Sequence, residues 1–163
     1  MGNSFSADEI FEMAEEIERN GAKFYRQAAK NTSDKETKQM LLELADMEDE
    51  HLTTFQQMRS KLNKEGGGEA ALDLDNQAVV YLHAMADARG SEGKKSPTQA
   101  LTGNESMKEI LNAAINAEKD SVVFYYGLRE AVPARAGRGQ VRAIIHEELS
   151  HITTLLQKSK ELN

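Results

Sequence analysis

Glu48-Asp49-Glu50-His51 and Glu148-Leu149-Ser150-His151 are two copies of one spacing, Glu-x-x-His, placed one hundred residues apart. Residues i and i+3 share a face of an α-helix, so each copy directs one carboxylate and one imidazole the same way. A further glutamate, Glu18 or Glu118, precedes each copy by thirty residues. Two Glu-x-x-His pairs and two separate glutamates, one element on each helix, are the ligand set of a dinuclear metal site in a four-helix bundle.

The repeat extends well beyond these motifs. When the sequence is shifted by one hundred positions, thirteen of the fifty-five residues from 9 to 63 are identical, without a gap. Average residue usage gives about three identities by chance over that length. The chain is therefore interpreted as a duplicated helical hairpin, and two hairpins related by a pseudo-twofold axis would bring all six candidate ligands to one central layer.

Composition limits the class of protein. The chain has 163 residues, a net charge of −7 and no cysteine, which disfavours nucleic acid and anionic membranes as partners and excludes disulfides and thiolate-bound metals. No run of eighteen apolar residues is present, and the first residues lack the features of a secretory signal. We expect a cytoplasmic protein. Abundant Glu, Lys, Ala and Leu with only two prolines indicate an all-α fold.

Apolar periodicity and capping signals predict one domain over residues 1–163, a four-helix bundle. Ser6, Ser33 and Ser106 each stand three residues before a glutamate, which is the pattern of a capping box. The first helix pair spans 7–63, with helices over 7–31 and 34–63. A crossover over 64–103 contains a short helix over 77–89, and the second pair spans 104–162, with helices over 104–131 and 139–161. The long connection allows the second and third long helices to run parallel.

Burial separates the candidate ligands from ordinary surface glutamates. Glu12, Glu15, Glu16, Glu43 and Asp49 lie off the apolar stripes and are expected in water. Four glutamates lie within those stripes, where an unpaired carboxylate costs several kcal/mol: Glu18, Glu48, Glu118 and Glu148. The stripes carry no Lys or Arg, so two divalent cations are the simplest neutralising charge. One imidazole per metal, from His51 and His151, favours iron, with manganese or a mixed pair as alternatives.

The spacing suggests a role for each residue. Glu48 and Glu148 are expected to bridge the two metals as the catalytic ligands. The remaining ligands would divide between the metals, Glu18 with His51 and Glu118 with His151. Tyr25 and Tyr125 each follow a ligand glutamate by seven residues, so their hydroxyls are expected to hydrogen-bond ligand carboxylates. Glu147, four residues before His151, is a candidate for orienting that imidazole, although Met47 occupies the matching position.

These segments resemble a known superfamily. The stretches from Glu18 to Tyr25 (ERNGAKFY) and from Glu118 to Tyr125 (EKDSVVFY) are similar to the Glu…Phe-Tyr helices of the ferritin-like superfamily, and within it of rubrerythrin-like diiron proteins. The two Glu-x-x-His segments resemble the partner helices. The resemblance differs in two respects: the cysteines of a rubredoxin domain are absent, so a rubrerythrin-like protein without that domain is expected, and Ser121 stands where rubrerythrins carry an extra glutamate.

The resemblance implies a ferritin-like fold and a non-haem diiron oxidoreductase in which Fe(II) reacts with hydrogen peroxide or oxygen. Gly21 and Ser121, one turn after Glu18 and Glu118, are small and would leave room for an oxidant. Electrons would come from Fe(II) itself, as in a ferroxidase, or from an external donor protein, as in a peroxidase. A homodimer is expected. Alternatives are an iron-storage subunit, a helical module with a structural metal, and a diiron monooxygenase acting on an organic substrate.

Overall fold

The computed structural model describes residues 6–64, 77, 80–82, 84 and 101–162. Four long helices account for most of them: α1 (Ala7–Lys30), α2 (Lys35–Lys64), α5 (Met107–Ala131) and α6 (Arg138–Glu161). A short 3-10 helix, η1 (Ala134–Ala136), precedes α6. No strand occurs among the described residues. The predicted all-α four-helix bundle is confirmed.

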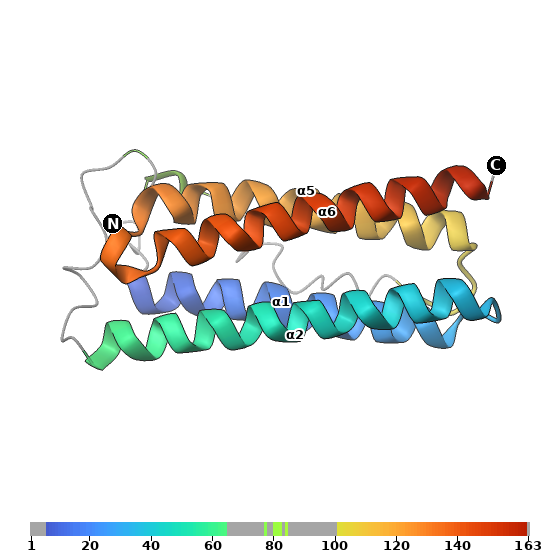
Figure 1. Ribbon diagram of the computed structural model, residues 1–163, viewed down its shortest axis with the longest axis horizontal. Helices are drawn as coiled ribbons and strands as arrows, with labels where there is room; N and C mark the ends of the chain where they lie inside the picture. The colour runs from blue at the N-terminus through green and yellow to red at the C-terminus, as the bar shows by residue number, and fades with distance from the viewer. Residues whose placement is uncertain (1–5, 65–76, 78–79, 83, 85–100, 163) are drawn as a thin grey trace.

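The bundle consists of two antiparallel hairpins, α1 with α2 and α5 with α6, which pack on one another through α1–α5 and α2–α6 contacts. Figure 1 shows that α2 and α5 run in the same direction, as the predicted crossover requires. Residues 77, 80–82 and 84 are helical. The rest of the predicted crossover helix, and most of the crossover, lies outside the described residues.

Local capping explains where the helices begin. Ser6 and Ser106 each form a complete capping box, with Glu9 and Glu109 respectively, which satisfies backbone N–H groups that have no helical partner. The third long helix therefore begins at Met107, three residues later than predicted. The second begins differently from the prediction, because Asp34 rather than Ser33 accepts the hydrogen bond from the Thr37 backbone N–H, at 2.8 Å.

The turn between α5 and α6 depends on a glycine. Gly137 has φ of 109°, a left-handed conformation that side chains with a Cβ rarely adopt. A Cβ at this position would also lie 2.6 Å from the Met58 Cε atom of α2. The glycine thus allows the second hairpin to close while its loop packs against the end of the first.

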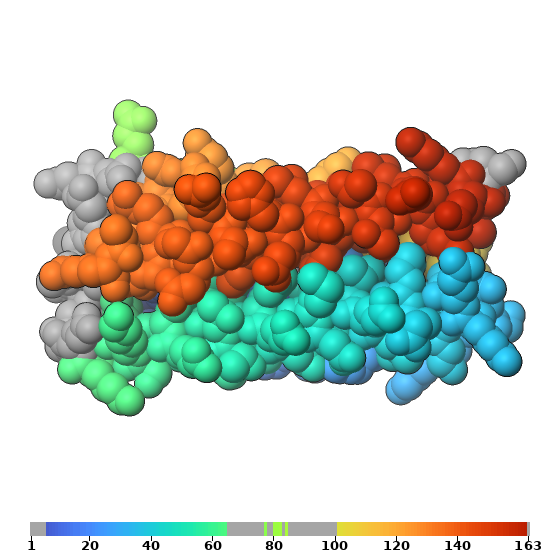
Figure 2. Space-filling model, viewed as in Figure 1, coloured from blue at the N-terminus to red at the C-terminus, as the bar shows by residue number. Residues whose placement is uncertain are grey.

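Two apolar clusters fill the interior, one towards each end of the bundle. The first includes Phe11, Phe55 and Val141, and the second includes Phe24, Leu44 and Leu111. The candidate ligands lie in sequence between the residues of these clusters on all four helices. On the face shown in Figure 2, α6 and α2 lie against each other along their length and cover the interior. No helix in the described part of the chain is both long and apolar enough to cross a bilayer.

Candidate metal centre

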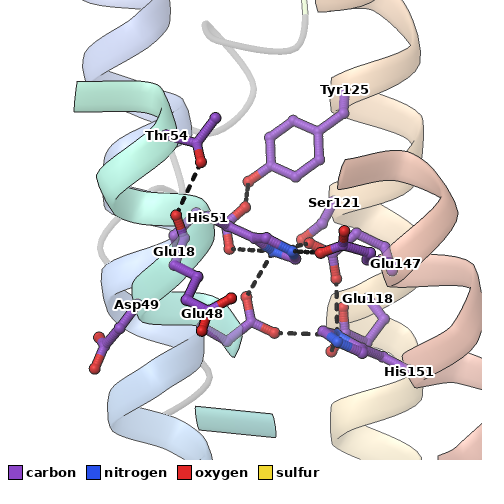
Figure 3. A network of polar contacts seen from close by, with 12 residues as sticks. Glu18, Glu48, Asp49, His51, Thr54, Glu118, Ser121, Tyr125, Glu147 and His151 are labelled. Atoms are coloured by element: carbon purple, nitrogen blue, oxygen red, sulfur yellow. Dashed lines mark hydrogen bonds and ion pairs between the residues drawn. The ribbon is translucent and has the colours of Figure 1, made fainter. Parts of the chain in front are cut away.

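All four long helices contribute to one buried polar layer. The six side chains that the sequence singles out come together there, each at most 4% exposed. Figure 3 labels all of these residues except Glu148 and shows the labelled ones directed towards the centre of the bundle. The contributing residues, in helix order, are Glu18 from α1, Glu48 and His51 from α2, Glu118 from α5, and Glu148 and His151 from α6.

The layer divides into two overlapping groups of potential ligands. Glu18 and His51 belong to one group, Glu118 and His151 to the other, and Glu48 with Glu148 belongs to both. Within each group the ligand atoms lie within 4.8 Å of one another. Atoms on opposite sides of a divalent metal with bonds of about 2.1 Å lie about 4.2 Å apart, so each group is close to the size of a single ion site.

Each imidazole presents Nδ1 to the carboxylates. The His51 Nδ1 atom lies 3.0 Å from a Glu148 oxygen and 3.4 Å from a Glu18 oxygen. The His151 Nδ1 atom lies 3.1 Å from the other Glu148 oxygen and 3.3 Å from a Glu48 oxygen. The two rings are stacked, with centroids 5.8 Å apart and planes inclined by 19°. Glu148 therefore contacts both histidines, one through each carboxylate oxygen.

Burial is the largest influence on the pKa values of three of the ligand carboxyl groups. It raises the pKa of Glu18 well above its usual value, and the neighbouring Glu48 raises it further. Burial also raises the pKa of Glu118, to about 7, although the nearby His151 opposes the change. Burial acts on Glu148 in the same direction, but the close contacts with His151 and His51 outweigh it and leave the pKa below its ordinary value.

The imidazoles respond in the opposite way. Burial alone lowers the pKa of a histidine, but the close Glu148 and Glu18 carboxylates raise the pKa of His51 to about 11. The pKa of His151 rises to about 12, because its close contacts with Glu118 and Glu148 outweigh its burial. In the absence of metal, the two protonated imidazoles thus provide part of the positive charge that the four buried carboxylates require. No Lys or Arg among the described residues forms an ion pair with the four ligand glutamates.

The two tyrosines bond across the bundle. The Tyr25 hydroxyl donates to Glu118 Oε1, and the Tyr125 hydroxyl donates to Glu18 Oε1. Each tyrosine therefore holds the terminal glutamate of the other hairpin, and each glutamate keeps its second oxygen for a metal. Burial, followed by the charge of the acceptor carboxylate, raises the pKa of both phenols well above 10.0, so they remain hydrogen-bond donors.

Glu147 contacts a different histidine from the one suggested by its spacing. Its Oε2 atom lies 2.7 Å from the Nε2 atom of His51, on the opposite hairpin (Figure 3). The Nε2 atom of His151 is buried and has no hydrogen-bond partner among the described residues. The sequence carries a signal that the two histidines differ, because the residue equivalent to Glu147 in the repeat is Met47.

One expected surface carboxylate is buried. Glu15 is only 7% exposed, whereas the apolar pattern placed it in water. Arg59 of α2 reaches over it, with Nη1 at 3.4 Å from Glu15 and a bidentate pair to Asp8 at 2.7 Å. The long arginine side chain covers the carboxylate while neutralising it. Glu15 thus belongs to an ion-pair network between α1 and α2, separate from the metal centre.

The small residues near the ligands have different surroundings. A Cβ on Gly21 would lie 3.2 Å from the Glu48 Oε2 atom, so the absence of a side chain lets that carboxylate lie close to the α1 backbone. The Ser121 hydroxyl donates to the Ala117 carbonyl of its own helix, at 3.0 Å. Of these two small residues, Gly21 is therefore the one that lies against a ligand carboxylate.

The donor set fits a pair of divalent metals. Five of its six residues have at least one buried polar atom without a hydrogen-bond partner among the described residues, including both oxygens of Glu148 and Nδ1 of both histidines. Such atoms are rare in folded proteins unless an ion or water satisfies them. Carboxylates with one imidazole per site suit iron or manganese, and a cluster of this kind can bind two ions that share Glu48 and Glu148.

Comparison with known proteins agrees with this geometry. The family model described as Rubrerythrin matches residues 9–158. A structure from Thermotoga maritima, described as a ferritin-like diiron-carboxylate protein, superposes with a TM-score of 0.71 at 24% identity and covers 98% of each chain. At that identity the likeness shows the fold. A search of curated proteins gives no match. Because the family model spans most of the sequence, this chain belongs to the rubrerythrin family.

Proposed function

We propose that this protein is a non-haem diiron oxidoreductase that reacts Fe(II) with hydrogen peroxide or oxygen. The observation that carries the proposal is the buried layer of four glutamates and two histidines, in which no Lys or Arg supplies the balancing charge. Glu18 with His51 and Glu118 with His151 would each hold one iron, and Glu48 and Glu148 would bridge them. The bound irons would supply the electrons that reduce the oxidant.

The surrounding residues support this role. The Tyr25 and Tyr125 hydroxyls fix the orientation of the terminal carboxylates, so the ligands are held before any metal binds. Apolar clusters at both ends limit water around the layer, which strengthens its electrostatic interactions. The absence of a side chain at Gly21 lets the Glu48 carboxylate lie close to the α1 backbone.

Anaerobic loading with Fe(II), followed by separate addition of hydrogen peroxide and oxygen, tests the proposal. We expect about two irons per chain and rapid oxidation. A single stoichiometric oxidation would identify a ferroxidase, and repeated turnover with an added reductase would identify a peroxidase. Glu48→Ala combined with Glu148→Ala should abolish iron binding, whereas Glu43→Ala, at an exposed position of α2, should not. Bound iron that reacts with neither oxidant would contradict the proposal and indicate a structural metal.

A further inference from the structure

The two halves of the metal centre differ at the outer ring nitrogens of their histidines. On one side, Glu147 Oε2 lies 2.7 Å from the Nε2 atom of His51. On the other side, the Nε2 atom of His151 is buried and has no hydrogen-bond partner among the described residues. The residue related to Glu147 by the repeat is Met47, which is half-buried. A thioether is a weak acceptor and cannot replace a carboxylate.

Several other contacts around the centre are matched. Each terminal glutamate accepts one tyrosine hydroxyl from the opposite hairpin. Each imidazole directs Nδ1 to an oxygen of the shared Glu148, at 3.0 and 3.1 Å. Ser121, which corresponds to Gly21 in the repeat, bonds to its own helix rather than to a ligand. Glu48 lies less evenly between the histidines, with oxygens 3.3 Å from His151 Nδ1 and 3.9 Å from His51 Nδ1. At the outer ring nitrogens, the difference between the two halves lies at positions 147 and 47.

A carboxylate on the outer nitrogen of a histidine has a known effect on metal binding. It holds the proton on Nε2, leaves the Nδ1 lone pair for the metal, fixes the ring and increases its basicity. His51 has this partner and His151 lacks it. A metal at His151 must bind an imidazole whose tautomer and orientation are less restricted, so part of its binding free energy is lost in ordering the ligand.

We propose that the two metal positions are inequivalent, and that the position formed by Glu18 and His51 binds its ion more tightly than the position formed by Glu118 and His151. Glu147 is the positioning residue that creates the difference. The inference rests on the dinuclear site in the proposed function. Loss of such a carboxylate lowers metal affinity about 10- to 100-fold in comparable sites, and we expect a difference of that size between the positions.

Anaerobic titration of the metal-free protein with Co(II) measures both affinities. Calorimetry and the Co(II) visible absorption should resolve two events whose dissociation constants differ about 10- to 100-fold. The chain has four histidines, so histidine ring resonances can be followed by NMR. The first equivalent should shift the resonances of His51, and the second those of His151.

Variants identify the cause of the difference. Glu147→Met should weaken the first event about 10- to 100-fold and leave the second unchanged. Met47→Glu should strengthen the second event by a similar factor. Glu147→Gln, which retains an oxygen acceptor for the Nε2 proton, should preserve most of the separation. Glu50→Met removes the same charge from an exposed site two residues after Glu48 and should change both events equally and only slightly.

The results also separate this inference from the proposed function. Two events of equal affinity, or a Glu147→Met variant that weakens both events alike, would overturn the inequivalence and leave the dinuclear site intact. A first equivalent that shifts the resonances of His151 would overturn the assignment of the tighter position. Absence of Co(II) uptake would overturn both proposals. Circular dichroism of each variant checks that the helices have formed before affinities are compared.

Discussion

At the scale of single residues, hydrogen bonds to the ligands decide how the centre is held. The two tyrosine hydroxyls cross between the hairpins, so that Tyr125 orients Glu18 and Tyr25 orients Glu118. Both phenols are fully enclosed, and their pKa values are raised by burial and by the adjacent carboxylates. Each hydroxyl therefore remains protonated and donates to a group that has few other partners within the bundle.

Removal of one of these donors should destabilise the metal-free protein. Tyr125→Phe leaves Glu18 Oε1 buried without its donor, and loss of a hydrogen bond to a carboxylate typically costs about 1.5–3 kcal/mol. Urea unfolding measures the free energy. Tyr126→Phe is the matched control, because Tyr126 is the next residue and is 55% exposed; its effect should stay within about 0.5 kcal/mol. Equal effects of the two changes would show that the buried hydroxyl contributes no stability.

At the scale of elements, side-chain caps fix the ends of the helices. Ser6 and Ser106 occupy matching positions in the repeat and form the same reciprocal bonds, with Glu9 and Glu109. The first caps α1 and the second caps α5, and Figure 1 places the beginnings of these two helices at opposite ends of the bundle. The duplicated sequence therefore supplies one capping box to each hairpin.

Loss of either cap should lower stability by a similar amount. Ser6→Ala and Ser106→Ala each remove an acceptor for an unpaired backbone N–H, which costs about 1 kcal/mol. Because the two sites are far apart, the double variant should lose about 2 kcal/mol. Thermal and urea unfolding measure the change. Ser60→Ala, at an exposed position inside α2, should be neutral or slightly stabilising, since alanine favours a helix interior. A double variant as stable as the wild type would refute this account of the helix ends.

At the scale of the whole molecule, the metal centre exists only when the two hairpins pack together. The first hairpin supplies Glu18, Glu48 and His51, but each ligand group also needs Glu148 from the second. Docking the hairpins therefore brings four carboxylates into one buried layer, and the charge must be balanced at that step. Without metal, protons on the two histidines balance part of it, and the raised pKa of Glu18 favours the neutral form of that carboxyl.

Metal and protons should compete for this layer. His51 and His151, with pKa values of about 11 and about 12, hold protons at neutral pH, and Glu118, with a pKa of about 7, holds one below neutrality. Loading two divalent ions at about pH 6 should therefore release at least about three protons per chain, and the raised pKa of Glu18 adds to that number. Since all four pKa values are raised, metal affinity should increase with pH, and the release should fall by about one proton as pH rises above 7.

Proton release can be measured with an indicator dye in weakly buffered solution during anaerobic Co(II) addition. The double variant Glu48→Gln with Glu148→Gln lacks both shared ligands and should neither bind the metal nor release protons. Release of one proton or fewer by the wild type would mean that the metal-free layer is not held by protonated histidines.

Much of the fold and of the centre follows from the sequence. The Glu-x-x-His spacing, the seven-residue step from Glu18 to Tyr25 and the hundred-residue repeat all describe positions on one helix face, which the 3.6-residue period fixes. The same periodicity indicated four long helices and the six residues that meet in the layer. The sequence alone does not select the cap of the second helix, because Ser33 and Asp34 are both good caps; the hydrogen bond from the Thr37 backbone N–H identifies Asp34.

Contacts between helices were decided by the tertiary structure. The sequence associated Glu147 with His151 on its own helix, but the carboxylate reaches His51 of the other hairpin. It also predicted that Glu15 is exposed to solvent, whereas Arg59 of α2 covers that side chain. Helical periodicity gives the direction of a side chain from its own axis, but its partner depends on the rotation and offset of the neighbouring helix. The sequence by itself thus determined which residues form the centre, and the packing of the two hairpins determined which atoms support each histidine.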